Sequence, residues 1–229
     1  MRLRNLIMIS TIILILTNTT MVNSQIIDLN KEESTVILVV GFGPFLNYEI
    51  NPSELIAAEL DGETIKNAEI IGLQILPNLS NFSESIQIVY QAIEDYDPDF
   101  VFSIGLAAKY ENIRIERIGL NLKIEENSSL KILIQNKPLI RISPIPSIKI
   151  VKELKNESIP SQTGLFAGFS LCNGMLYSVL NYIDENNLDI KSGFIHVPLH
   201  KTEENPDAME LETMVNATRI IINFSLDFF

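Results

Sequence analysis

Cysteine is almost absent from this chain, since its 229 residues include a single one, Cys172. One thiol excludes an intramolecular disulfide and therefore a disulfide-stapled scaffold. Histidine is nearly as scarce, with only His196 and His200. Their His-x3-His spacing indicates a metal site only on a helix, and Pro198 between them is incompatible with one. The chain also lacks a Gly-x-Gly-x-x-Gly loop and a Walker loop, so we expect neither a metal nor another cofactor.

Positive charge is the next shortage, because 17 Lys and Arg stand against 29 Asp and Glu and give a net charge of −12. The basic residues are scattered, whereas binding to nucleic acid requires a clustered basic face. Nucleic acid is therefore excluded as an expected partner. The apolar run from Leu6 to Leu16 is also shorter than the ~20 residues that a membrane-spanning helix needs. We expect no membrane span in the mature chain.

The first 24 residues are typical of a secretory signal peptide. A basic start at Arg2 and Arg4 precedes the apolar run, and short residues precede Gln25. Cleavage after Ser24 is predicted, and an uncleaved anchor is the alternative. Six Asn-x-Ser/Thr triplets are candidate glycosylation sites that accompany a secretory route: Asn78, Asn81, Asn127, Asn156, Asn216 and Asn223. The predicted location is therefore extracellular or in the lumen of the secretory pathway.

The remaining chain divides into a polar lead-in over 25–34, which we expect to be mobile, and one domain over 35–229. Val36–Val40 is continuously apolar, as in a strand covered on both faces. Asn51-Pro-Ser-Glu54 then supplies a helix N-cap and a first-turn proline. Further predicted strands are 69–76, 100–106, 113–122 and 193–197, and predicted helices are 83–96, 147–156, 172–184 and one within 208–226. This alternation predicts a single-domain α/β fold with a mostly parallel twisted sheet and helices on both faces.

The segment 123–146 has no clear period, and we interpret it as a long surface loop or hairpin. Ligands of open α/β sheets bind at the carboxyl ends of strands, so residues beyond strands are the first candidates for a site. Cys172 opens a helix, where free N–H groups stabilise a thiolate and can bind an oxyanion. His196 lies in a short predicted strand. In the predicted strand 113–122, the alternation of side chains places Arg114 and Glu116 on the same face. A buried small cysteine, a core histidine and a solvated strand face are the alternative interpretations.

Four motifs in order resemble the pyroglutamyl peptidase I family over residues 35–225: Gly41-Phe-Gly-Pro-Phe45 with Asn51-Pro-Ser53, Glu116-Arg-Ile-Gly-Leu-Asn121, Gly168-Phe-Ser-Leu-Cys-Asn173 and Gly193-Phe-Ile-His-Val-Pro198. The resemblance implies a cysteine exopeptidase in which the Cys172 thiolate attacks, His196 is the base and acid, and Glu116 orients His196. Its substrate would be a peptide with an N-terminal pyroglutamate. By the same resemblance Phe42, Phe45, Leu106 and Leu171 bind the substrate, and Asn51 gives structural support.

This chain departs from the family pattern at two places. The family's Gln-Ala-Gly-Gly-Arg stretch is replaced by Leu106-Ala-Ala-Lys-Tyr110, and its Arg-x-Pro-Asp-Asn loop is replaced by a region with Glu125-Glu-Asn127. Loss of a hydrogen bond to a buried polar ligand group costs ~1–3 kcal/mol. A secreted homologue that binds blocked peptides without cleaving them, or that cleaves another amide, is therefore the alternative function. The sequence predicts no oligomeric state.

Overall fold

The structure is a computed structural model, and it describes residues 34–77, 82–124, 128–202 and 204–229. The predicted signal peptide, nearly all of the lead-in and the glycosylation acceptors Asn78, Asn81 and Asn127 lie outside these residues. Thr35–Phe229 form one compact unit. Among the described residues, no helix has the length and apolar content to cross a membrane.

An eight-stranded sheet organises this unit, with the strand order β2-β3-β1-β4-β10-β5-β8 and β9 paired to β5. Its centre is four parallel strands, β3 (Ala68–Ile75), β1 (Val36–Phe42), β4 (Phe100–Leu106) and β10 (Lys191–Val197). Beyond β10, β5 (Ile113–Leu120) runs antiparallel, and β9 (Ser161–Phe166) is parallel to β5. The short strands β2 (Thr64–Ile65) and β8 (Ile140–Ile142) pair antiparallel with β3 and β5. The predicted mostly parallel sheet is confirmed.

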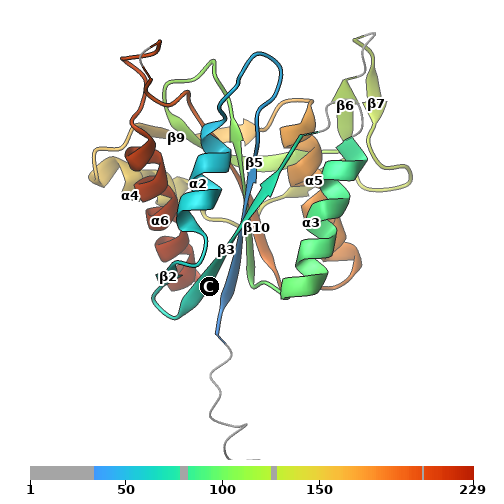
Figure 1. Ribbon diagram of the computed structural model, residues 1–229. Helices are drawn as coiled ribbons and strands as arrows, with labels where there is room; N and C mark the ends of the chain where they lie inside the picture. The colour runs from blue at the N-terminus through green and yellow to red at the C-terminus, as the bar shows by residue number, and fades with distance from the viewer. Residues whose placement is uncertain (1–33, 78–81, 125–127, 203) are drawn as a thin grey trace, which may run out of the picture. The chain divides into compact units, whose positions relative to one another are not determined.

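Within the described residues, five helices cover the two faces of the sheet, as the sequence predicts. In Figure 1, α2 (Pro52–Leu60), α4 (Ser147–Asn156) and α6 (Leu211–Phe228) lie on one side of the sheet. On the other side lie α3 (Phe82–Tyr96) and α5 (Leu171–Glu185). Because successive side chains of a strand point to opposite faces, each central strand contributes to both layers of core.

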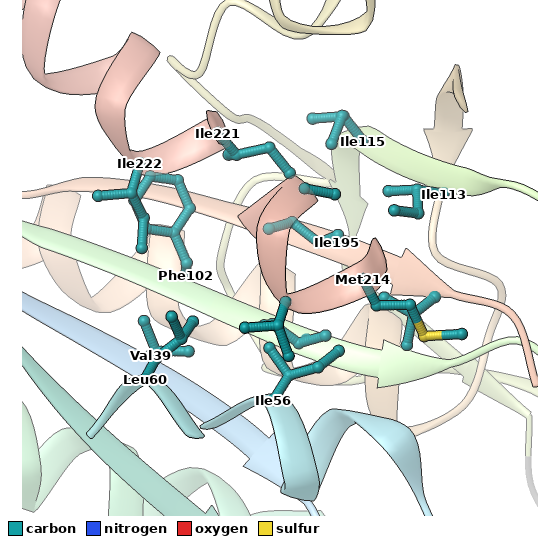
Figure 2. Close-up of a cluster of buried hydrophobic side chains, with 14 of the residues drawn as sticks. Val39, Ile56, Leu60, Phe102, Ile113, Ile115, Ile195, Met214, Ile221 and Ile222 are labelled. Atoms are coloured by element: carbon teal, nitrogen blue, oxygen red, sulfur yellow. The ribbon is translucent and has the colours of Figure 1, made fainter. Parts of the chain in front are cut away.

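β1 shows why its sequence reads as a continuous apolar run. Ile37 and Val39 pack into the core under α2 and α6, whereas Leu38 and Val40 pack into the core under α3 and α5. Figure 2 shows the first of these cores, where the helix side chains Ile56, Leu60, Met214, Ile221 and Ile222 meet the strand side chains Val39, Phe102, Ile113, Ile115 and Ile195. A polar residue on either face of β1 would be buried without a partner. The sequence of β1 therefore lacks the alternation of apolar and polar residues that a half-exposed strand has.

The aperiodic segment 123–146 contains more regular structure than its pattern indicates. β6 (Leu122–Ile124) and β7 (Leu130–Ile132) form an antiparallel pair outside the main sheet, which agrees with the predicted hairpin. β8 follows and joins the edge of the main sheet beside β5. β9 has no counterpart among the predicted strands, since Ser161, Gln162, Thr163 and Gly164 give it a polar composition.

Candidate active site

Cys172 is the second residue of α5, on the loop that leads from β9 into the helix. The N-cap residue Ser170 makes no side-chain capping hydrogen bond, so it does not occupy the first-turn N–H groups. The neighbouring side chain of Asn173 is fully buried and bonds to the backbone of β5 and β6. Its Oδ1 accepts from the Leu120 N–H at 2.8 Å, and its Nδ2 donates to the Leu120 and Leu122 carbonyls at 2.8 and 2.9 Å. These bonds fix the first turn of α5, and with it the thiol, against the sheet.

The sulfur of Cys172 lies against the carboxyl end of β4. A Cβ atom placed on Gly105 would lie 3.2 Å from the Cys172 Sγ and 2.9 Å from the Phe194 ring. Any side chain at position 105 would therefore crowd both groups, and glycine leaves the space in which the thiol sits. This edge of a parallel sheet is where α/β proteins bind their ligands.

His196 projects from β10 toward the same place. Its Nδ1 lies 3.0 Å from Oε1 of Glu116, and the Cys172 side chain is close enough to the ring to raise the pKa of His196. Because Glu116 engages Nδ1, Nε2 is the nitrogen available to the thiol. The Phe194 ring meets the imidazole edge to face at a centroid distance of 5.0 Å, and only 7% of His196 is exposed. The ring is thus held between a thiol and a carboxylate.

The surroundings of His196 favour its charged form. Burial lowers the pKa of the imidazole, but hydrogen bonds to Cys172 and Glu116 and the negative charges of both groups outweigh it and raise that pKa from 6.5 to about 9. The contacts of the imidazole with these two side chains therefore outweigh the effect of its burial. At neutral pH this raised pKa favours the imidazolium form of His196. An imidazolium is the partner that a reactive cysteine uses in a Cys–His pair.

Glu116 reaches His196 from the adjacent strand β5 and is only 2% exposed. Its carboxylate fits because Gly164 is its register partner on β9, where a Cβ atom would lie 1.8 Å from the Glu116 Oε2. Arg114 lies on the same face of β5, as the alternation predicts, with its Nε 3.4 Å from the Glu116 Oε1. Oε2 is buried and has no hydrogen-bond partner among the described residues.

Two of the predicted substrate-binding residues lie in the core cluster against which Cys172 packs, namely Phe42 and Leu171, and both are buried. Phe45 is half-buried and lies outside that cluster, with its ring 5.4 Å from the ring of Tyr48. Leu106 is buried at the last position of β4, in register with Val197. A substrate-binding role for these four side chains stays a prediction.

Asn51 stands at the N-cap of α2, where the sequence places it. Its Oδ1 accepts from the Ser53 N–H at 3.1 Å, and its Nδ2 donates to the Gly43 carbonyl at 3.0 Å. The side chain therefore ties the loop after β1 to the start of α2. Sequence reasoning gave no role to Gly105, Gly164 or Asn173. A lone glycine inside a predicted strand is the available signal for Gly105, because it marks a close approach of another group. Gly164 offered no such signal, since it lies in a strand that the sequence does not predict.

The site combines a thiol at a helix N-terminus, an imidazole beside it and a buried carboxylate bonded to the imidazole. These are the parts of a cysteine hydrolase. Comparison with known proteins identifies the family of this enzyme. Residues 35–227 match the model of the pyroglutamyl peptidase family. The chain belongs to this family of cysteine peptidases of the pyroglutamyl peptidase I type.

This chain aligns with nearly the whole length of individual relatives. Pyrrolidone-carboxylate peptidase 1 of Caldanaerobacter subterraneus subsp. tengcongensis is 35% identical over 197 residues, which are 81% of this chain and 95% of the relative. The pyrrolidone-carboxylate peptidase of Brachyspira hyodysenteriae is 36% identical over 204 residues, 82% of this chain and 98% of the relative. A crystal structure of a mutant pyrrolidone carboxyl peptidase from P. furiosus superposes with a TM-score of 0.77 at 28% identity, over 84% of this chain and 99% of that one.

Proposed function

We propose that the protein is an exopeptidase that hydrolyses the bond between an N-terminal pyroglutamyl residue and the rest of a peptide. The observation that best supports this proposal is that Glu116, His196 and Cys172 lie side by side at the carboxyl end of the parallel strands. The names of the relatives point to the same substrate class. No cofactor is needed for this reaction.

In the first half of the reaction the Cys172 thiolate attacks the pyroglutamyl carbonyl carbon and forms a C–S bond. The developing oxyanion would lie near the first-turn N–H groups of α5, which Ser170 leaves uncapped. His196 then donates its proton to the departing amine as the C–N bond breaks. The products of this half are a free shortened peptide and a pyroglutamyl thioester on Cys172.

In the second half His196 is neutral and accepts a proton from water, whose oxygen attacks the thioester carbonyl. The C–S bond breaks, pyroglutamate leaves as the acid, and the thiolate with its imidazolium partner is restored. Glu116 keeps the ring oriented and stabilises its charged form in both halves. The reaction consumes one water for each peptide bond.

The direct test is hydrolysis of a pyroglutamyl-amide reporter by the purified protein in the presence of a reductant. We expect turnover from the wild type and none above background from Cys172→Ser, which removes the thiolate and keeps the size of the side chain. Equal rates for the two proteins would exclude the proposed reaction. An alanyl-amide reporter with the same leaving group is the matched control for pyroglutamyl specificity.

Leu106 favours a second candidate, a homologue with altered specificity or without catalysis. An aliphatic side chain is buried at the end of β4, where the family pattern places a polar one. The second altered stretch, Glu125-Glu-Asn127, lies outside the described residues. Tight binding of a pyroglutamyl peptide without product release, measured by calorimetry, would favour this candidate over the first.

We further propose that the chain is secreted and glycosylated after removal of residues 1–24. The three candidate acceptors within the described residues are all exposed, Asn156 at the end of α4 and Asn216 and Asn223 on α6. Exposure is what a bulky glycan needs. Expression in a eukaryotic secretory host should release the protein into the medium with a mass that drops on endoglycosidase treatment.

A further inference from the structure

Among the described residues, Arg114 is the one Lys or Arg whose side chain lies within ion-pair distance of Glu116. Its Nε approaches the Glu116 Oε1 at 3.4 Å, the same oxygen that bonds to the His196 Nδ1 at 3.0 Å. The Arg114 side chain is 16% exposed, and its guanidinium carbon lies 4.1 Å from the centroid of the Tyr110 ring. Arg114 is thus held between a carboxylate on one side and an aromatic face on the other.

We propose that Arg114, supported by the Tyr110 ring, is a positioning residue that holds the Glu116 carboxylate toward His196. It acts through Glu116 and does not contact the substrate. The inference rests on the proposed function in one respect, because it assumes that Glu116 orients the His196 ring during the reaction. It adds Arg114 and the Tyr110 ring to the three residues Cys172, His196 and Glu116.

The need for such a residue follows from the space around the carboxylate. Gly164 has no side chain to press against Glu116, and Oε2 has no hydrogen-bond partner among the described residues. The carboxylate is therefore anchored through Oε1 alone, by His196 and Arg114. If Arg114 is removed, a single contact remains, and rotation of the carboxylate moves the acceptor away from the ring nitrogen.

Arg114 also places a positive charge next to two buried ionisable side chains, Glu116 and His196. The described groups that face Glu116 are Arg114 on its own strand, His196 on β10 with Cys172 beyond it on α5, and the uncharged Gly164 on β9. Arg114 thus places a positive charge beside the buried Glu116 side chain, on the oxygen that also contacts His196. Removal of the guanidinium leaves an excess of negative charge, which retains protons more strongly.

The test compares Arg114→Met with Arg114→Lys, Tyr110→Leu and the matched control Arg117→Met. Arg117 is exposed and follows Glu116 directly, so its side chain points to the opposite face of β5. With the pyroglutamyl reporter we expect Arg114→Met to lower kcat about 10- to 100-fold with KM within about twofold, as for a misplaced catalytic group. Arg114→Lys, which keeps the charge, should recover part of the loss, and Tyr110→Leu should fall between wild type and Arg114→Met.

A second readout does not depend on the substrate. Cys172 is the single cysteine, so its alkylation by iodoacetamide gives one adduct that mass spectrometry counts. We expect the pH profile of alkylation for Arg114→Met to move upward by about one unit, the size of a typical effect of a neighbouring charge, while Arg117→Met keeps the wild-type profile. This profile separates the two proposals, because it reports on the Cys–His pair even if the wild type cleaves no pyroglutamyl reporter.

The positioning role is overturned if Arg114→Met keeps the wild-type alkylation profile. It is also overturned if Arg117→Met changes the profile equally, since the effect would then reflect net charge alone. A folded state is confirmed for each variant by its thermal melting curve. If Arg114→Met fails to fold, Arg114→Lys and Tyr110→Leu decide the question by the same two measurements.

Discussion

At the scale of single residues, Gly164 matters because of an atom that it lacks. A Cβ atom there would overlap the Glu116 carboxylate at 1.8 Å, so Gly164→Ala must displace that carboxylate or separate β9 from β5. We expect kcat to fall about 100-fold, since displacement of a catalytic group by about 1 Å has this effect. The measurement is the steady-state rate on a pyroglutamyl reporter.

Gly174→Ala is the matched control for this substitution. Position 174 lies in the same helix as Cys172, and a Cβ atom there would meet nothing closer than the Phe82 ring at 3.6 Å, an ordinary contact. Alanine also favours a helix over glycine by about 1 kcal/mol. We therefore expect Gly174→Ala to keep wild-type activity. If both variants lose activity equally, the space around Glu116 is not the cause.

His196 links protonation to stability with a defined sign. Its pKa is about 9 in the folded protein and 6.5 when unperturbed, so the folded state binds the proton more tightly. The stabilisation is fully present below pH 6.5 and is lost as the pH rises through about 9. The free energy of unfolding of the wild type should therefore fall between these pH values relative to that of His196→Gln. Urea denaturation at pH 6, 7.5 and 9 measures the difference, and parallel curves for the two proteins would contradict the linkage.

At the scale of elements, Asn173 joins α5 to the end of β5. Asn173→Ala leaves the Leu120 N–H and the Leu120 and Leu122 carbonyls without their partner. Because an unsatisfied buried polar group costs about 1–3 kcal/mol, we expect a loss of about 2–4 kcal/mol in the free energy of unfolding. Activity should fall as well, since the first turn of α5 carries Cys172.

The control for this prediction is Asn186→Ala, at the exposed C-terminal end of the same helix. Within the part of the chain that the structure describes, its side chain bonds to the Tyr182 carbonyl alone, in contact with solvent. Surface substitutions of this kind stay within about 0.5 kcal/mol. Chemical denaturation of both variants compares them, and equal losses would show that Asn173 does not join the two elements in the proposed way.

The elements also show how far the sequence predicts the fold. β4 was predicted at its observed bounds and α2 at its first residue, because a buried apolar run and an N-cap followed by proline are local signals. β9 was missed, since its polar residues follow neither period, and its role depends on a register with β5 that no local pattern encodes. The contact between Glu116 and His196 spans 80 positions. Periodicity predicts that Glu116 and His196 each lie on a strand. Only the resemblance to a family predicts that the two side chains act in one site.

At the scale of the whole molecule, the proposed leader and the proposed activity meet at Gln25. Cleavage after Ser24 makes Gln25 the N-terminal residue, and an N-terminal glutamine cyclises by attack of its amine on its side-chain amide, with release of ammonia. The product is a pyroglutamyl residue, the group that the enzyme is proposed to remove. One molecule should therefore process the N-terminus of another, and the secreted wild type should begin at Ile26.

The matched sample is Cys172→Ser, secreted from the same host. It has the same leader and the same Gln25 but lacks the thiolate, so its N-terminus should remain pyroglutamyl at position 25. Intact mass after removal of glycans distinguishes the two, because the chains differ by one pyroglutamyl residue in addition to the known mass change of Cys172→Ser. If both proteins keep residue 25, the enzyme does not act on its own N-terminus. A chain that retains residues 1–24 would instead contradict the predicted cleavage, whatever the activity on a reporter.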